Sequence, residues 1–120
     1  MKPARIANLI LDSVDPEAIV PFWSELLGLQ VADRLREGEY VEFAVPAEGK
    51  VVLMLQRVPE DKVGKNRMHM DLEVEDLEEA TAEIERLGGR WDGQAREQDG
   101  FPWRIMTHPQ GNEFCILLPG

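Results

Sequence analysis

The feature that most restricts the fold of this chain is an internal duplication. Residues 8–29 align with residues 69–90 without a gap, at a constant offset of 61 positions, the difference between 69 and 8. The matched pairs include Leu11 with Leu72, Asp15 with Asp76, Leu26 with Leu87 and Gly28 with Gly89. A repeat of this length predicts two similar modules that face each other across a pseudo-twofold axis.

The first copy reads as a strand, a helix and further strands. Residues 5–13 alternate loosely and are rich in Ile and Leu, which favours a strand. Asp15-Pro16-Glu17 is typical of a helix start, and Gly28 is typical of a helix end. The predicted buried stripe of this helix is Ile19, Val20, Trp23, Leu26 and Leu27. Residues 40–45 and 51–56 predict two strands joined by a hairpin-like turn at 46–50, and 30–36 predicts another.

The second copy repeats this order. Residues 68–74 predict a strand. A capping box at Asp76 begins a helix, and Gly88-Gly89 ends that helix. Its predicted buried face is Leu77, Ala80, Ile84 and Leu87. Trp91 begins a strand, 93–100 is a loop, and 103–107 and 113–118 are strands around a turn that contains His108. The predicted fold class is α+β, with two tandem βαβββ modules at about 5–57 and 68–120, a linker at about 58–67, and one domain over 1–120.

Alternation along the first strand of each module assigns its faces. In the second module Met70, Leu72 and Val74 form the apolar set that we expect beneath the helix. The opposite face carries His69, Asp71 and Glu73, and in the first module it carries Asn8, Ile10 and Asp12. Two readings of these polar rows are open: they line a wet cleft of ligand size, or they face solvent.

Composition excludes several classes of partner. The net charge of −10 and the pI near 4.6 would repel phosphate backbones, so no nucleic-acid partner is expected. The charge either keeps a small protein in solution or attracts a cationic ligand. No apolar run approaches the roughly 20 residues of a membrane helix, so no membrane partner is expected. The chain lacks a signal-peptide pattern, and its single cysteine agrees with a reducing compartment, so a cytoplasmic location is expected.

Three segments carry a family resemblance: FWSELLGL at 22–29, KNRMHMDLEVEDLEEA at 65–80 and HPQGNEFCILL at 108–118. Their order and spacing resemble the vicinal oxygen chelate superfamily of glyoxalase I, extradiol dioxygenases and bleomycin-resistance proteins, and most closely its single-domain glyoxalase-like branch. The resemblance implies that the two modules curve into an open cup of roughly eight strands with the ligand inside. It also implies a homodimer.

The resemblance further implies a place for a metal ion. In metal-dependent members the ligands, commonly His and Glu, come from the first and last strand of each module. Carried over, these positions fall on Asn8, on Met54 or Leu53, on His69 and on Cys115. Only His69 is a usual ligand there. Because a hard divalent cation needs several imidazole or carboxylate donors, we expect no metal and no cofactor.

Several residues have a structural and a functional interpretation. His69 either hydrogen-bonds a neighbour within its strand or contacts a ligand, with Asp71 or Asp12 able to orient it as a general base. Cys115 fits a small core residue better than a reactive thiol. Arg67 and Arg104 are candidates to pair with the carboxylates of Asp12, Asp71, Glu73 and Glu113, which would make that cluster structural. Trp103, with Phe101, could form an aromatic wall.

The leading hypothesis is metal-independent binding, or sequestration, of a small organic ligand, with a cationic ligand as the sharper version. The predicted ligand-binding residues are Asn8, Asp12, His69, Asp71, Trp103 and Glu113. The alternative is a lyase, isomerase or dioxygenase-like enzyme that uses His69 as acid–base or an atypical metal at His69 and Cys115. A third hypothesis is an interaction module whose cup is filled by its own side chains.

Overall fold

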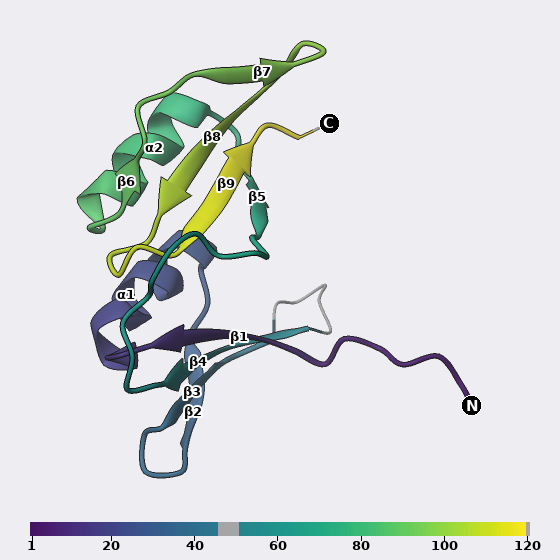
Figure 1. Cartoon of the computed structure of the whole chain (residues 1–120), viewed down its shortest axis with the longest axis vertical. Helices are drawn as coiled ribbons and strands as arrows, with labels where there is room; N and C mark the ends of the chain where they lie inside the picture. The colour runs from purple at the N-terminus through teal and green to yellow at the C-terminus, as the bar shows by residue number, and fades with distance from the viewer. Residues whose placement is uncertain (46–50, 120) are drawn as a thin grey trace. The chain divides into compact units, whose positions relative to one another are not determined.

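The structure is a computed structural model that describes residues 1–45 and 51–119. The chain forms two compact units, 1–61 and 62–120. The boundary between them falls inside the segment that the sequence predicts as a linker, 58–67. Each unit contains one helix and one mixed sheet (Figure 1), and this confirms the α+β class.

The first unit contains β1 (Asn8–Ser13), α1 (Pro16–Leu27), β2 (Val31–Leu35), β3 (Tyr40–Phe43) and β4 (Val52–Arg57). Its sheet has the order β1-β4-β3-β2, in which β1 and β4 are parallel and the other neighbours are antiparallel. Helix α1 begins after Asp15 with Pro16 in its first turn, and it ends at Gly28, whose φ of 65° is left-handed. The predicted turn at 46–50 lies outside the described residues.

Helix α1 packs on β3 and β4 through a stripe that differs slightly from the predicted one. Ile19 and Trp23 are buried as expected, but Phe22 is buried as well, whereas Leu26 and Leu27 are only half-buried. The rings of Phe22 and Trp23 meet edge to face with centroids 5.0 Å apart. The buried face is therefore centred nearer the start of the helix than the periodicity indicates.

The second unit contains β5 (Asp71–Glu73), α2 (Leu77–Arg86), β6 (Arg90–Trp91), β7 (Arg96–Gln98), β8 (Phe101–Thr107) and β9 (Glu113–Leu117). The sheet order is β5-β9-β8-β6, and β7 pairs with β8. The Asp76 carboxylate accepts the backbone N–H of Glu79 at 2.9 Å, so the predicted helix cap is confirmed. Ile84 of α2 is fully buried, as are Met106 and Ile116 of the sheet.

The strand registers reproduce the sequence duplication. In the first unit Ile10 lies opposite Met54 in the parallel pair β1–β4, and in the second unit Asp71 lies opposite Cys115 in the parallel pair β5–β9. Both members of the second pair stand 61 positions after those of the first. The two modules therefore share their topology and their register as well as their sequence pattern.

Two expectations about strands need correction. Residues 93–100 were expected to be a loop, but Arg96–Gln98 forms β7 and adds a fifth strand to the second sheet. The reason is the turn Asp99-Gly100: both residues have positive φ, 52° and 82°, as a two-residue hairpin turn with matching twist requires. The strand expected over 68–74 is also shorter, and His69 precedes β5.

The predicted alternation of faces is confirmed in both first strands. Leu72 is partly buried between the exposed residues Asp71 and Glu73, and Leu9 and Leu11 alternate in the same way with Asn8, Ile10 and Asp12. Among the described residues, no helix is both long and apolar enough to cross a membrane.

Candidate functional site

The second unit contains a pocket of about 580 Å³. Its apolar lining comes mainly from Phe101, Pro102, Trp103, Leu117 and Leu118, and its polar lining comes from His69, Asp71, Gln98 and Cys115. The volume lies within the range of about 300–1,000 Å³ that is usual for small-molecule sites, and so does the combination of an apolar wall with few polar groups. This geometry suits an organic molecule of modest size.

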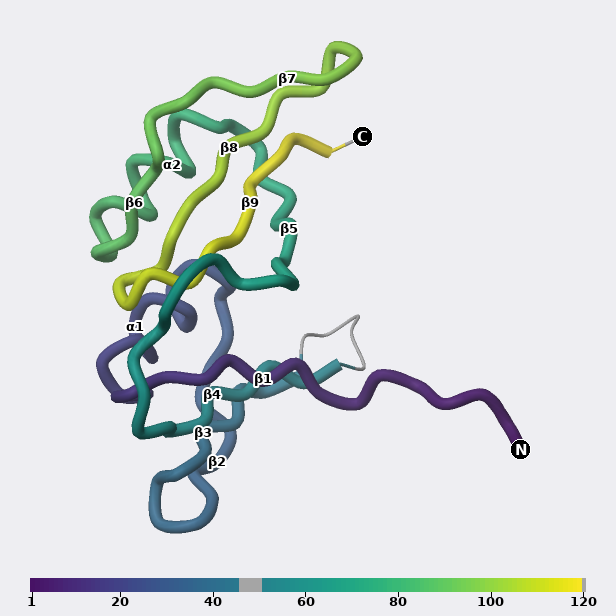
Figure 2. The backbone as a smooth tube through the Cα atoms, in the orientation of Figure 1, coloured from purple at the N-terminus to yellow at the C-terminus, as the bar shows by residue number. Residues whose placement is uncertain are grey.

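The hairpin β7–β8 builds one wall of the pocket. The chain leaves β7, turns tightly and returns as β8 (Figure 2), and residues on both sides of the turn line the pocket, among them Gln98, Gly100 and Trp103. At the start of β7, an ion pair 2.7 Å long joins Arg96 to Asp92 and so links the hairpin to the preceding loop. Phe101 remains 65% exposed at the rim of the pocket. The aromatic wall predicted at Trp103 and Phe101 therefore belongs to a strand pair that the sequence analysis assigned in part to a loop.

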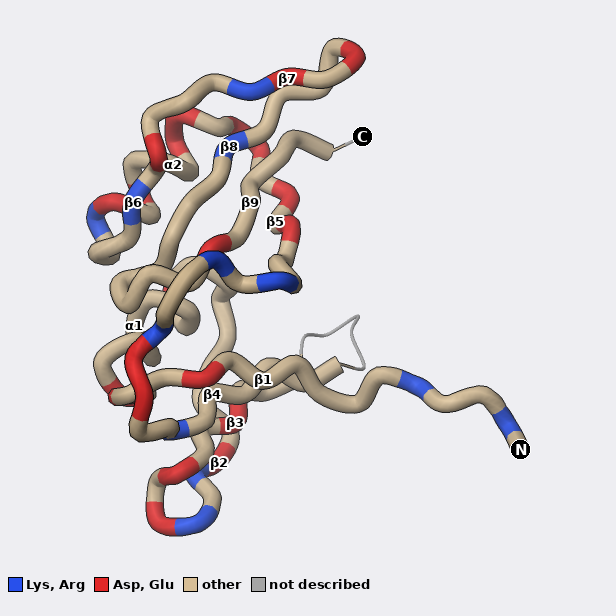
Figure 3. Tube along the Cα trace, viewed as in Figure 1, with Lys and Arg blue, Asp and Glu red and all other residues tan. Residues whose placement is uncertain are grey.

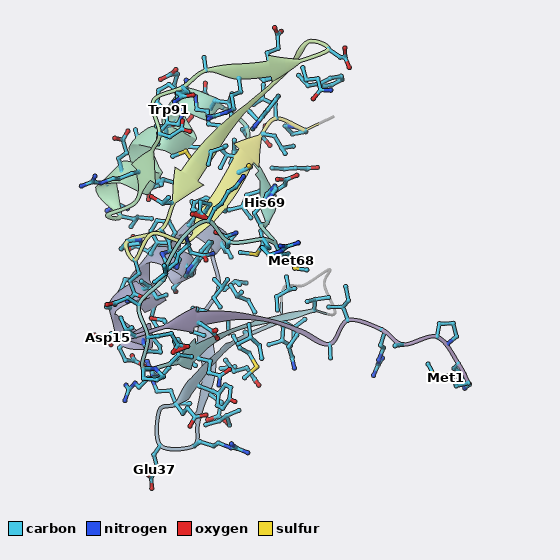
Figure 4. All side chains as sticks on the ribbon, in the orientation of Figure 1. Met1, Asp15, Glu37, Met68, His69 and Trp91 are labelled. Carbon is cyan, nitrogen blue, oxygen red and sulfur yellow. The ribbon has the colours of Figure 1, made fainter. Side chains whose placement is uncertain are left out.

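The polar end of the pocket brings three side chains together. His69 lies two residues before β5 (Figure 4), and its Nε2 is 3.4 Å from Oδ1 of Asp71. Cys115 is the register partner of Asp71 on β9. One nitrogen, one carboxylate oxygen and one sulfur of these residues all lie within 4.8 Å of one another. The side chains of His69 and Asp71 are 48% and 56% exposed, whereas Cys115 is buried.

The environment of Cys115 keeps it a thiol. Burial raises its pKa, and the negative charge of Asp71 raises it further. Since the thiolate is the reactive form, a protonated thiol is a poor nucleophile. This favours the interpretation of Cys115 as a neutral part of the pocket lining over a catalytic nucleophile.

Glu113 is engaged elsewhere. Its carboxylate accepts hydrogen bonds from Lys62 Nζ at 2.7 Å and from the backbone N–H of Asn66 at 2.9 Å, and its own N–H donates to Asn66 Oδ1 at 2.8 Å. Burial acts to raise the pKa of Glu113, but these hydrogen bonds outweigh it and the net pKa is lowered. Glu113 is not among the residues that line the described pocket. These contacts favour a structural role, in which Glu113 fixes the segment before β5 to the start of β9.

Of the predicted site residues, His69, Asp71 and Trp103 therefore meet in one pocket. Asn8 and Asp12 lie on the exposed face of β1 in the first unit. Gln98 and Leu117 also line the pocket, and neither was predicted as a site residue. The sequence does contain a signal for Gln98. Asp99-Gly100 follows it directly, and Asp-Gly is among the strongest short-range indications of a hairpin turn.

The donors do not fit the cation expected from the resemblance. Two of the four carried-over positions are Asn8, a neutral amide, and Met54, a buried thioether. The alternative position, Leu53, has no donor atom. Hard cations such as Mg²⁺ or Mn²⁺ require oxygen or imidazole ligands, so the first module offers them almost nothing.

Comparison with solved structures identifies the fold. A glyoxalase/bleomycin resistance protein/dioxygenase family enzyme from Burkholderia phytofirmans PsJN aligns over 96% of this chain and 98% of its own, with a TM-score of 0.79 and 13% identity. A lactoylglutathione lyase from Agrobacterium tumefaciens aligns over 98% and 96%, with a TM-score of 0.66 and 18% identity. A glyoxalase-related enzyme from Fulvimarina pelagi aligns over 96% and 88%, with a TM-score of 0.71 and 21% identity.

At these identities the structural likeness shows the fold alone. No curated protein matches the chain. The glyoxalase-like domain family matches residues 8–117, which includes every helix and strand described above. The chain therefore belongs to the glyoxalase-like domain family, within the vicinal oxygen chelate superfamily.

Proposed function

We propose that the second-unit pocket binds a small organic ligand directly, without the divalent cation of metal-dependent superfamily members. The observation that carries this proposal is the pocket in which an aromatic wall, Trp103 and Phe101, stands together with a polar end, His69 and Asp71. A pocket of this kind can hold a planar group on the wall and fix its orientation through a few polar contacts.

Charge indicates which ligands should bind best. The Asp71 carboxylate offers hydrogen-bond acceptors, so it suits a ligand with a hydrogen-bond donor or a positive charge. Acidic residues recur along β5 (Figure 3), and the whole chain carries a net charge of −10. This field would raise the local concentration of cations. We infer that the ligand is a flat amine or amide of modest size.

A titration of chelator-treated protein tests the proposal. Planar aromatic amines, their neutral isosteres and the matching carboxylates should bind in that order of affinity, as measured by calorimetry. Asp71→Asn and Trp103→Ala should each weaken binding about tenfold or more, since each removes about 1.4 kcal/mol or more of contact. The matched control is Glu73→Gln, because Glu73 is exposed on the same face of β5 but does not line the pocket. Equal affinity in all three variants would disprove the location.

A second candidate function is acid–base catalysis. It is favoured by the 3.4 Å approach of His69 Nε2 to Asp71, since a neighbouring carboxylate can hold an imidazole in a fixed orientation for proton transfer. The structural neighbours also include proteins described as a lyase and an oxidase. An enzyme would lose turnover in His69→Gln while still binding ligand, whereas a binding protein would show no turnover to lose.

A further inference from the structure

We propose that His69, Asp71 and Cys115 form a three-donor site for a borderline or thiophilic divalent cation such as Zn²⁺, contained in the second unit. We further infer that this ion competes with the organic ligand, a part that rests on the proposed function. His69 and Cys115 are two of the four positions implied by the resemblance. The site differs from that set because it needs no residue of the first module and takes its third donor from Asp71, which is not one of the four.

The backbone places the three donors on one face. His69 and Asp71 are two positions apart, so alternation directs both side chains the same way, and the two are exposed while Met70 between them is partly buried. Asp71 and Cys115 are register partners on neighbouring parallel strands. The donor atoms of all three residues lie within 4.8 Å of one another, and the nitrogen of His69 is 3.4 Å from an oxygen of Asp71. Ligand atoms around a tetrahedral zinc are about 3.5 Å apart, as bond lengths of about 2.0–2.3 Å require.

Small side-chain movements can close the remaining gap. Cys115 is buried at 8% exposure in the middle of β9 and provides a fixed sulfur. His69 lies outside the regular strand and is half exposed, so its ring can rotate toward the sulfur.

The donor types determine which ions fit. Imidazole, thiolate and carboxylate are all established zinc ligands, and three protein ligands with one open position is the usual arrangement of a non-structural zinc. Cys115 is a thiol without the ion, so binding of the ion would release the thiol proton to solvent, and affinity should increase with pH. Thiolate disfavours Mg²⁺ and Ca²⁺, which take oxygen ligands. The trio should therefore select Zn²⁺, Co²⁺ or Cd²⁺ from a mixture that contains excess Mg²⁺.

The first module provides an internal comparison. The residues that stand 61 positions before the trio are Asn8, Ile10 and Met54. Ile10 has no donor atom, and Met54 cannot become a thiolate. The second copy of the duplication can therefore hold such an ion, and the first copy cannot.

Competition follows from shared atoms. The imidazole nitrogen and carboxylate oxygen that would bind the ion are the same atoms that the proposed organic ligand would use. An ion at the trio leaves only its own open position for a ligand atom. Ligands with a positive charge should be displaced most strongly.

Metal binding by the full chain, without any organic ligand, tests the site. After chelator treatment, Co²⁺ in the presence of excess Mg²⁺ should bind at one equivalent and produce the near-ultraviolet charge-transfer band of a cobalt–thiolate bond. Cys115→Ala should abolish the band. Asp71→Asn should weaken binding at least about tenfold, since even outer-shell partners are worth that much. Asn8→Ala should leave both band and affinity unchanged, and circular dichroism should confirm that each variant is folded.

Two results would overturn the site. One is the absence of a cobalt–thiolate band at stoichiometric metal. The other is a loss of Co²⁺ affinity in Asn8→Ala as large as in Asp71→Asn, which would mean that the first module also contributes a ligand.

The competition between ion and organic ligand has its own test. Zn²⁺ should weaken uptake of a planar amine by the wild type but not by Cys115→Ala, which keeps His69 and Asp71 for the ligand. If metal-free protein takes up no amine, the proposed function fails while the cobalt result still decides the metal site.

Discussion

Asp71 faces Cys115 across the parallel pair β5–β9, at the register position where Ile10 faces Met54 across β1–β4. The same backbone arrangement therefore carries a carboxylate and a thiol in one module and two apolar side chains in the other. Because the register is shared, the difference between the modules at this position lies in the side chains alone. At this register position, the second module is therefore the one that carries a carboxylate and a thiol.

Transplanting the three residues should create a second metal site. The triple variant Asn8→His, Ile10→Asp and Met54→Cys puts the same donors at the same register positions of the first unit. Ile10 is 45% exposed, so an aspartate there remains solvated. We expect Co²⁺ stoichiometry to rise from one equivalent to two, measured by absorbance titration. The double variant without Met54→Cys is the control and should stay at one; a folded triple variant that also stays at one would contradict the geometric argument.

Gly100→Ala should weaken the pocket wall. Gly100 has a φ of 82° in the β7–β8 turn, a conformation in which a Cβ is strained although nothing lies within 4 Å of it. We expect a loss of about 1 kcal/mol in unfolding free energy and weaker ligand binding, measured by urea denaturation and calorimetry. Asp99→Asn should keep both values, because asparagine tolerates the positive φ of 52° at that position.

Arg104→Lys should destabilise the second unit. The Arg104 guanidinium lies 3.9 Å from the ring centroid of Trp91, donates to Thr81 Oγ1 at 2.8 Å and pairs with Glu78. Its side chain is only 12% exposed. Lysine cannot both stack and donate from a planar fork, so we expect a loss of about 1–2 kcal/mol, measured by denaturation.

The comparison for Arg104→Lys is Arg86→Lys. Arg86 forms an exposed i,i+3 pair with Glu83, and exposed pairs contribute about 0–1 kcal/mol. Its replacement should therefore be close to neutral. Equal losses in the two variants would show that the stacking on Trp91 contributes nothing.

His108 should make stability depend on pH below neutrality. Burial lowers its pKa, and its Nδ1 accepts the backbone N–H of Gln110 at 3.0 Å, which requires that nitrogen to be unprotonated. Above pH of about 6.5 both the folded and unfolded chains are neutral at this residue. As pH falls below that value, the unfolded chain takes up a proton first, so the free energy of unfolding decreases.

The matched variant is His108→Asn, whose side-chain oxygen can accept the same N–H at any pH. Denaturation at pH of about 7.5 and 5.5 should show a decrease in stability that is about 1 kcal/mol larger for the wild type than for His108→Asn. If His108→Asn and the wild type lose the same free energy of unfolding between these pH values, His108 is not the cause of the pH dependence.

The local elements of this protein could be read from its sequence because their signals lie within a few residues. The Asp76 cap acts three positions away, Gly28 ends α1 by its own backbone conformation, and alternation around Leu72 depends on immediate neighbours. The duplication extended these signals to two modules. The same reasoning failed for β7. Its three residues are all polar, so they show no apolar alternation, and the strand forms because the Asp99-Gly100 turn pairs it with β8.

Only the tertiary structure decided how the site is composed. His69 and Asp71 are neighbours in sequence, but Cys115 joins them through the register of β5 on β9, and Trp103 joins them through the hairpin that β8 forms with β7. Register between distant strands is selected by how whole faces pack, so no local pattern specifies it. Likewise, Glu113 was predicted to bind ligand, and only its hydrogen bonds to Lys62 and Asn66 reveal a structural engagement. The sequence by itself therefore determined the modules and their faces, whereas long-range pairing determined which side chains meet.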